Sequence, residues 1–203
     1  MITFLLNIKN QYYHLAVTNI VQDLMNESNN LHYTIENQWD TDSLAKADII
    51  FMDMVAGEWY LCNRIFKQAK ENSKLIIIQD DKFIMNSKKL PNCLQSASFL
   101  PPHTSVSYYK EELGKLLEDS RLLENKKINT NPYRCIGCRC KSLTEAQKKV
   151  IYAFNVGLSP REIGEALQIS HKTVYAHKKS IMNRFKLKSR YEFSCFVQRY
   201  SQQ

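Results

Sequence analysis

The C-terminal third of the chain contains four helix-capping motifs in close succession, and these constrain the fold more than any other feature of the sequence. The four cap residues are Thr144, Ser159, Ser170 and Ser189. Three of them are followed, three residues later, by Gln or Glu, which is the capping-box pattern of a helix start. Apolar residues at helical spacing follow each cap, so each helix has one side to bury. The sequence therefore predicts four short helices packed into one compact unit.

The second and third of these helices are separated only by the connection Gln168-Ile169-Ser170. Two short helices joined by so tight a turn indicate a helix-turn-helix. The third helix, about residues 171–185, carries several cations beside short side chains. A helix that enters the major groove of DNA needs both, because some side chains must reach base edges while cations contact phosphates.

Charge is distributed unevenly along the 203 residues. Residues 133–203 hold 14 Lys and Arg against 4 Asp and Glu, whereas residues 1–132 hold 14 against 16. A strongly basic region after a slightly acidic one favours a polyanion as the partner of the basic part, most often nucleic acid. The simpler alternative is a basic surface that is only solvated.

Several short motifs in the basic region resemble the LuxR/NarL/FixJ-type helix-turn-helix. In chain order they are Leu143-Thr144-Glu145, Gly157-Leu158-Ser159, Glu162-Ile163-Gly164-Glu165-Ala166-Leu167, Ile169-Ser170, Lys172-Thr173-Val174 with His177, and Lys188-Ser189-Arg190. The resemblance covers about residues 142–200 without a gap, so it is more specific than one isolated motif. It implies an all-α four-helix domain that binds double-stranded DNA.

The resemblance also implies roles for single residues. The positions just after Thr-Val in the third helix read bases in this family, and here they are Tyr175, Ala176 and Lys179. Lys favours the acceptors of guanine and Ala can contact a thymine methyl, whereas Tyr departs from the Lys or Ser that is commoner at its position. Contacts to the DNA backbone are implied for Lys172, Thr173, His177, Lys178, Lys186, Lys188 and Ser189. The family's usual dimer surface corresponds to Tyr191, Phe193, Ser194, Val197 and Gln198.

Residues 1–120 alternate between short apolar runs and segments with helical spacing. The predicted strands are residues 2–6, 31–35, 48–52, 75–78 and 97–100, and the predicted helices are residues 11–25, 41–46, 58–70, 82–95 and 107–118. Continuous apolar strands between helices indicate a parallel sheet that is covered on both faces. We therefore expect a doubly wound α/β domain of the flavodoxin-like type.

This layout, followed by a helix-turn-helix, resembles a response-regulator receiver domain. Asp53 ends the third predicted strand, where receivers carry their phosphorylated Asp. The other groups of receiver chemistry, an acidic pair for Mg²⁺, a hydroxyl residue and a Lys, are replaced by Asn7, Ile8, Gln79 and Pro101-Pro102. Phosphoryl transfer to a carboxylate depends on such charges. The sequence therefore favours a pseudo-receiver, as in CsgD- and RcsA-like regulators, that serves dimerisation or partner binding. Phosphorylation of Asp53 is the alternative.

The predicted domains are residues 1–120 and 142–203, joined by a polar linker of residues 121–141. The linker ends in three thiols within six residues, Cys135, Cys138 and Cys140. These thiols can be ligands of a zinc ion that lacks an evident fourth ligand, redox-sensitive groups beside basic residues, or reduced thiols without a special role. We expect the last of these, and we predict no metal and no other cofactor.

The chain has no apolar stretch of membrane-spanning length and no secretory leader, so a cytoplasmic, nucleoid-associated bacterial protein is expected. The motifs of common enzymes are also missing: a Gly-rich phosphate loop, a nucleophile elbow and paired His ligands. The sequence thus predicts a sequence-specific DNA-binding transcriptional regulator, not an enzyme. Its expected partner, besides double-stranded DNA, is a second copy of the chain or a related regulator. An adaptor that joins a heterodimer without contacting DNA is the alternative.

Overall fold

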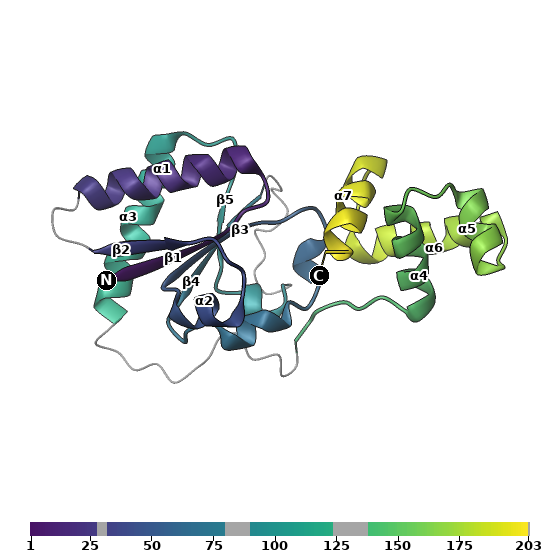
Figure 1. Cartoon of the computed structure of the whole chain (residues 1–203), viewed down its shortest axis with the longest axis horizontal. Helices are drawn as coiled ribbons and strands as arrows, with labels where there is room; N and C mark the ends of the chain where they lie inside the picture. The colour runs from purple at the N-terminus through teal and green to yellow at the C-terminus, as the bar shows by residue number, and fades with distance from the viewer. Residues whose placement is uncertain (28–31, 80–89, 124–137, 203) are drawn as a thin grey trace. The chain divides into compact units, whose positions relative to one another are not determined.

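The structure is a computed structural model that describes residues 1–27, 32–79, 90–123 and 138–202. The chain forms two compact units (Figure 1). The first unit consists of Met1–Met54 and Asn63–Cys138, and the second consists of Val55–Cys62 and Arg139–Gln203. None of the described helices combines the length and the apolar character needed to cross a membrane.

A five-stranded parallel sheet forms the centre of the first unit. Its strands are β1 (Ile2–Asn7), β2 (Tyr33–Glu36), β3 (Ile49–Asp53), β4 (Lys74–Ile78) and β5 (Ser98–Leu100). They lie in the order β2-β1-β3-β4-β5, and every neighbouring pair is parallel. The chain therefore crosses over from one side of β1 to the other, which is the doubly wound arrangement predicted from the sequence.

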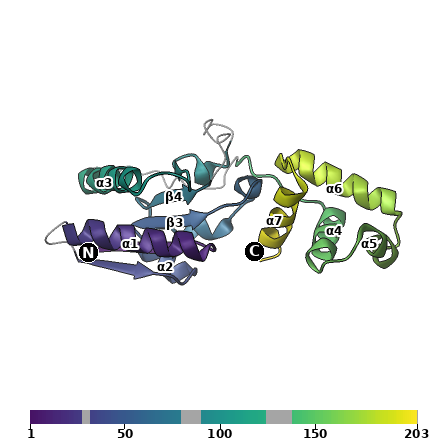
Figure 2. The same ribbon diagram turned by 90° about the horizontal axis from the view of Figure 1, so that it is seen from above.

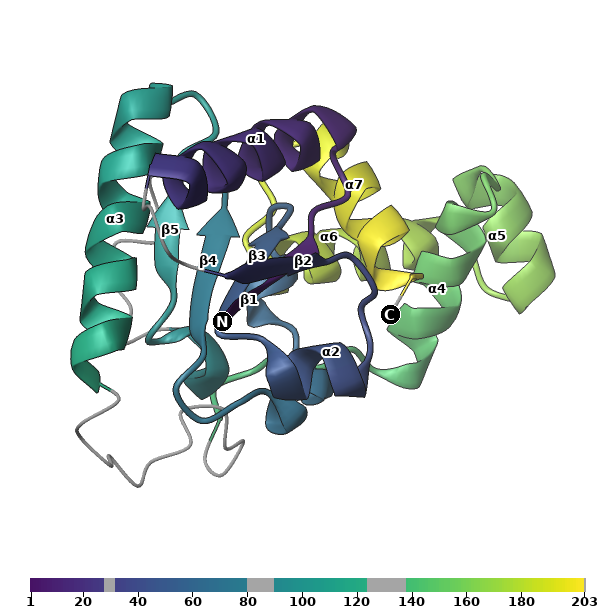
Figure 3. The same ribbon diagram turned by 60° about the vertical axis from the view of Figure 1, so that its left-hand side comes forward.

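Helices cover both faces of this sheet (Figure 3). α1 (Gln11–Glu27) and α3 (Val106–Leu123) lie on one face, and α2 (Thr41–Lys46) lies on the other together with the 3-10 helix η2 (Arg64–Gln68). Ile49 and Phe51 belong to the core beneath α1 and α3. Ile50 and Met52 alternate with them and are buried as well. Burial on both faces explains why β3 is a continuous apolar run.

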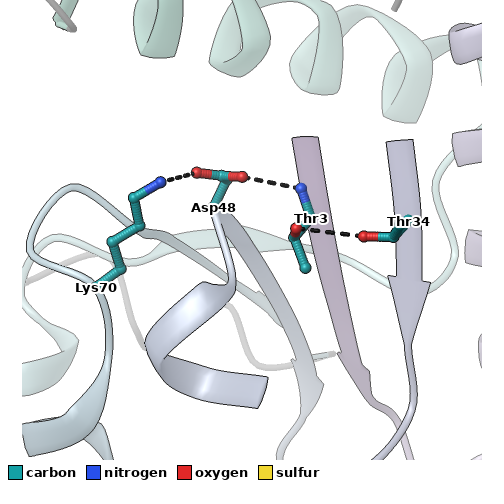
Figure 4. Close-up of polar contacts among 4 residues, drawn as sticks. All are labelled: Thr3, Thr34, Asp48 and Lys70. Atoms are coloured by element: carbon teal, nitrogen blue, oxygen red, sulfur yellow. Dashed lines mark hydrogen bonds and ion pairs between the residues drawn. The ribbon is translucent and has the colours of Figure 1, made fainter. Parts of the chain in front are cut away.

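A polar cluster holds the amino-terminal ends of three strands together (Figure 4). Asp48 precedes β3, and its carboxylate accepts the Thr3 backbone N–H with an N–Oδ2 distance of 2.9 Å and forms an ion pair with the Lys70 ammonium. The Thr34 hydroxyl donates to Thr3 Oγ1 at 3.2 Å, which links β2 to β1. The acidic Asp48 is therefore used to align strands, at the opposite end of β3 from Asp53.

The helix predicted over residues 58–70 is wrong. The chain forms two separate 3-10 helices instead, η1 (Glu58–Tyr60) and η2, and Leu61 between them is extended. Trp59, Tyr60 and Leu61 are all buried. Three consecutive buried residues do not fit a helix with one buried side, because successive helical residues point about 100° apart.

The helix predicted over residues 82–95 lies largely outside the described residues. Its described end forms a short 3-10 helix, η5 (Asn92–Leu94). Leu31, predicted to begin the second strand, also lies outside the described residues, and β2 begins at Tyr33. The remaining predicted strands and helices of this unit are present, with ends shifted by up to five residues.

Four helices dominate the second unit (Figure 2). They are α4 (Glu145–Asn155), α5 (Pro160–Leu167), α6 (His171–Phe185) and α7 (Arg190–Tyr200). All four predicted caps are confirmed, because each cap side chain accepts a hydrogen bond from the backbone N–H three residues later. The capping boxes of Thr144 and Ser159 are complete in both directions. Each helix start is therefore specified locally by its own cap.

The core of this unit is rich in aromatic rings. Phe185 of α6 and Phe196 of α7 lie 4.7 Å apart between ring centroids, and Phe154 and Phe193 meet edge to face at 5.3 Å. A second cluster joins α4, α5 and α6 through Val150, Ile163 and Val174, which are fully buried. Most of the apolar residues at helical spacing are therefore buried or half-buried, whereas Ala166 of α5, which was predicted to be buried, is exposed.

The turn between α5 and α6 depends on a glycine inside α5. A Cβ added at Gly164 would lie 2.7 Å from the backbone oxygen of Ile169 and 3.3 Å from the backbone N of His171. The Ile169 N–H also donates to the Gly164 carbonyl at 2.9 Å. The turn thus packs directly on the helix backbone, which only glycine permits without a shift.

Residues 55–62 of the second unit come from the loop after β3, about 80 residues before the rest of that unit. They include η1, which packs against α7. The sequence analysis did not predict this association. The domain limits at residues 120 and 142 remain predictions.

Candidate nucleic-acid interface

One side of α6 presents the residues that were predicted to read bases. Tyr175, Ala176 and Lys179 are all exposed, and Lys172 precedes them on the same side. Their spacing of three and four residues places them in one stripe along the helix. Val174, Ile181 and Phe185 occupy the opposite side and are fully buried. Packing of that side fixes the rotation of α6, so the polar stripe faces outward.

The stripe combines different chemistries over about two turns. Tyr175 is 55% exposed although it is large and aromatic, so its ring is available for contact. Ala176 adds a methyl group next to it, and Lys172 and Lys179 contribute ammonium groups on either side. Such a surface can hydrogen-bond, pack against a methyl group and neutralise a nearby anion.

Two of the residues predicted to contact the DNA backbone take part in helix caps: Thr173 is a partner of the cap residue Ser170, and Ser189 is itself a cap residue. The Thr173 N–H donates to Ser170 Oγ at 3.0 Å, and the two hydroxyls are 2.8 Å apart. Ser189 caps α7, where its Oγ accepts the Glu192 N–H at 3.0 Å. Both Thr173 and Ser189 are exposed, and the free N–H groups of a helix start favour an anion nearby.

His177 is half-buried and lies on a different side of α6 from the exposed stripe. It lines a groove with Lys149 of α4 and with Ala166, Leu167 and Gln168 at the end of α5. The sequence analysis did not single out Lys149. The sequence did contain a signal for it: the apolar residues of this helix define its buried side, and Lys149 lies off that side, so an exposed position could have been predicted.

Lys178 occupies a different environment from its neighbour Lys179. Its ammonium nitrogen lies 4.6 Å from the ring centroid of Phe193 and 5.4 Å from that of Phe154. Burial, and to a smaller extent the charge of Arg190, lowers the pKa of Lys178. The geometry therefore gives Lys178 a packing role between α4, α6 and α7 through cation–π contacts, besides any contact with DNA.

Lys186 and Lys188 lie in the connection between α6 and α7. Lys186 ends α6 in the left-handed conformation with φ of 57°, and it is exposed. The Lys188 backbone N–H donates to Glu192 Oε2 at 2.6 Å, which fixes the start of α7. Both side chains therefore extend from a connection with a defined backbone.

The predicted dimer surface on α7 is only partly accessible. Tyr191, Ser194 and Gln198 are exposed and share one side of the helix. Phe193 and Val197 are buried in the core of their own unit. The exposed stripe is thus narrower than the sequence implied, because two of the five residues are required for the aromatic core.

Asp53 lies at the carboxyl end of β3, as expected. Its carboxylate accepts the backbone N–H groups of Lys9 and Asn10, at 3.1 and 3.0 Å. Asn7 ends β1, and the buried Gln79 directly follows β4. Two backbone N–H groups, from the two residues that follow Ile8, thus hydrogen-bond to the Asp53 carboxylate.

The thiol cluster is only partly described. Cys135 lies outside the described residues, whereas Cys138 and Cys140 are half-buried. Within the part of the chain that the structure describes, no group of three or more metal-ligating side chains is found.

The fold and this surface together define a two-part chain, with a receiver-like α/β unit and a helix-turn-helix unit. The helix-turn-helix is of the LuxR type, because residues 141–197 match the family described as bacterial regulatory proteins, luxR family. This confirms the predicted resemblance and its limits to within a few residues. None of the curated proteins compared with the chain matches it.

Solved structures match the chain over nearly its whole length. RcsB from Salmonella enterica serovar Typhimurium, bound to a promoter in the presence of phosphomimetic BeF3-, is 15% identical and gives a TM-score of 0.52, covering 97% of this chain and 98% of that one. Full-length FixJ from B. japonicum is 13% identical with a TM-score of 0.37, covering 99% and 98%. At this level of identity the likeness to RcsB shows the fold, which agrees with the predicted receiver-like and helix-turn-helix order.

Proposed function

We propose that this chain is a sequence-specific DNA-binding transcriptional regulator that places α6 in the major groove. The observation that carries the proposal is the exposed stripe of Lys172, Tyr175, Ala176 and Lys179 on the second helix of a LuxR-type helix-turn-helix. Tyr175, Ala176 and Lys179 read base edges in this proposal. Lys172, Thr173, His177, Lys178, Lys186, Lys188 and Ser189 contact the DNA backbone.

The charge of the C-terminal region supports this role. Residues 133–203 hold 14 Lys and Arg against 4 Asp and Glu, and this positive charge attracts a polyanion and steers association. The regulator acts as a dimer through Tyr191, Ser194 and Gln198, so two half-sites lie about one helical turn apart. A related bacterial regulator can replace the second copy in a heterodimer.

The receiver-like unit serves dimerisation or partner binding in this proposal and does not transfer phosphate. Asp53 has backbone N–H partners, and Asn7 and Ile8 supply no carboxylate for Mg²⁺. Control by phosphorylation of Asp53 is the second candidate, favoured by its position at the end of β3. Loss of regulation in Asp53→Ala, with rescue by Asp53→Glu, is the result that supports this second candidate.

Selection of binding sites from random duplex DNA with the full-length protein, near physiological salt, tests the proposal. An enriched inverted repeat is the expected result for a dimeric regulator. A single enriched half-site indicates a missing heterodimer partner. Binding without enrichment, which fades as salt rises, contradicts sequence-specific recognition and leaves the adaptor as the better interpretation.

A further inference from the structure

A groove between three helices of the second unit lies beside α6, on a different side from its exposed stripe. Its volume is about 380 Å³, within the range of about 300–1,000 Å³ that is usual for ligand pockets. α4 contributes Ala146 and Lys149 to the lining, and α6 contributes His177. The end of α5 and the turn after it contribute residues 166–169. A groove of this size can take a few side chains of another molecule.

One part of the lining is apolar and is supported by the core beneath it. Leu167 and Ile169 are half-buried and pack against the core cluster that α4, α5 and α6 share. Ala146 and Ala166 are exposed and add methyl groups to the same lining. An apolar side chain that enters the groove therefore leaves water and contacts carbon atoms that are already held in place.

The other part of the lining is cationic. Lys149 is exposed on α4. Among the described residues, the ion pairs on α4 and α5 join Lys148 to Glu145 and Arg161 to Glu165, and neither pair includes Lys149. The ammonium group of Lys149 is therefore free to pair with a carboxylate from outside the chain.

The groove lies away from the residues proposed to read bases. His177 follows Tyr175 by two residues and precedes Lys179 by two, which places it about 200° around α6 from each of them. A DNA phosphate that reached this side would also find no use for the apolar surface of Leu167 and Ile169. A protein segment with both a carboxylate and an apolar side chain matches both parts of the lining.

We propose that this groove is a docking site for a partner protein that presents an acidic, amphipathic segment. Lys149 pairs with a carboxylate of the segment, and a neighbouring apolar side chain packs against Leu167 and Ile169. Charge complementarity selects this occupant, because the basic excess of residues 133–203 attracts acidic segments and repels basic ones. The exposed stripe of α6 stays open, so DNA and the partner can be bound at the same time.

This inference goes beyond the proposed DNA-binding function and does not depend on it. His177 is the one lining residue that is also proposed to contact the DNA backbone. The tests therefore use Lys149 and Ala166, neither of which has an assigned contact with DNA.

Selection of short random peptides displayed on phage, against the full-length protein without DNA and near physiological salt, tests the proposal. We expect enrichment of peptides that combine Asp or Glu with apolar residues at helical spacing. Binding of an enriched peptide, measured by fluorescence anisotropy, should weaken about fivefold in Lys149→Ala, as for the loss of one accessible ion pair. Arg190→Ala is the matched control: it removes an exposed cation of α7 outside the groove and should change the affinity by less than about twofold.

A pair of substitutions at Ala166 tests the same groove from α5. Ala166→Glu and Ala166→Gln introduce side chains of similar size at an exposed position, and only Glu adds a negative charge. Both residues favour a helix, so the fold is retained. The enriched peptide should bind Ala166→Glu about threefold more weakly than Ala166→Gln, because the new carboxylate repels the acidic segment.

Several results overturn the proposal. Failure to enrich acidic peptides removes the proposed occupant. Equal weakening in Lys149→Ala and Arg190→Ala indicates general attraction to a basic surface. A loss of DNA affinity in Lys149→Ala of more than about twofold, with peptide affinity unchanged, indicates that the groove holds a DNA phosphate. Because the peptides are measured without DNA, failure of the site-selection experiment leaves this test unaffected.

Discussion

Lys178 and Lys179 are neighbours in the sequence but face different surroundings on α6. Lys179 is exposed in the stripe with Tyr175 and Ala176, whereas the Lys178 ammonium packs against the rings of Phe154 and Phe193. A rotation of about 100° between successive helical residues separates them. Both were predicted to contact DNA, and the structure gives each a different physical setting in which to do so.

Lys179→Ala is expected to relax base preference at one position of the binding site. The cost in binding free energy for the preferred sequence is about 1–3 kcal/mol, as for the loss of one specific base contact. Affinity for unrelated DNA should change much less. Binding measured against a panel of single-base variants checks this, and equal loss on every sequence argues against a base-reading role.

A pair of substitutions at Lys178 separates packing from DNA contact. Lys178→Ala removes the side chain from the rings and should lower the free energy of unfolding by about 1 kcal/mol. Lys178→Met keeps most of the packing and removes an ammonium group whose pKa is lowered by burial. The free energy of unfolding should therefore be unchanged or higher. Denaturant unfolding checks both variants. If DNA affinity falls equally in both, the ammonium group contacts DNA; if it falls only in Lys178→Ala, the effect is structural.

Tyr109 is a buried group whose ionisation makes stability depend on pH. Burial raises the pKa of Tyr109 from 10.0 to about 12, and its hydroxyl donates to the Pro101 carbonyl at 3.0 Å. The folded state thus holds the phenol proton more tightly than the unfolded state does. Its contribution to stability is complete below pH 10 and is lost as the pH rises to about 12.

Comparison of the protein with Tyr109→Phe measures this contribution. The variant should be less stable at pH 8 by about 0.5–1.5 kcal/mol, the usual net value of one hydrogen bond. The difference between the two proteins should shrink as the pH rises from 10 towards 12. A difference that stays constant over this range indicates that Tyr109 ionises equally well in both states.

At the level of elements, the connection between α5 and α6 is set by backbone packing. Gly164 allows the Ile169 carbonyl to lie against α5, and Ser170 then caps α6. The angle between the two helices follows from this turn, and the angle decides how α6 presents its exposed stripe. Gly164 was part of the sequence motif that resembles the family. The steric reason why this position requires glycine is visible only in the structure.

Gly164→Ala should therefore destabilise the second unit by about 1–3 kcal/mol, the usual cost of overpacking. Gly114→Ala is the matched control, because Gly114 lies in α3 and a Cβ there meets no atom within 4 Å. That control should be neutral or stabilising by up to about 1 kcal/mol, since alanine favours a helix. Thermal unfolding of both variants checks the prediction, and equal effects would remove the steric argument.

For the whole molecule, the distribution of charge agrees with DNA binding by the second unit and not by the receiver-like unit. The basic excess belongs to residues 133–203, which include α4 to α7, whereas the receiver-like unit has almost balanced charge. Dependence of DNA binding on salt should therefore arise from the second unit.

Much of the fold and of the candidate site was predictable because the relevant interactions are local. The caps at Thr144, Ser159, Ser170 and Ser189 hydrogen-bond within three residues, and the buried stripes of α4 to α7 follow from helical periodicity. Apolar strands alternating with helices predicted the parallel sheet for the same reason. The exposed stripe on α6 then follows, because the apolar side of that helix must be inside.

The tertiary structure decided the features that depend on residues far apart in the chain. Glu58 and Arg199 are separated by about 140 residues, and no local pattern indicates their pairing. The predicted helix over residues 58–70 failed because Trp59, Tyr60 and Leu61 are all buried, and their burial is specified by distant partners. The ring contacts of Lys178 and the limited exposure of α7 also arise from packing between helices. Short-range hydrogen bonds and periodicity are encoded along the sequence, whereas burial by distant segments exists only once the chain has folded.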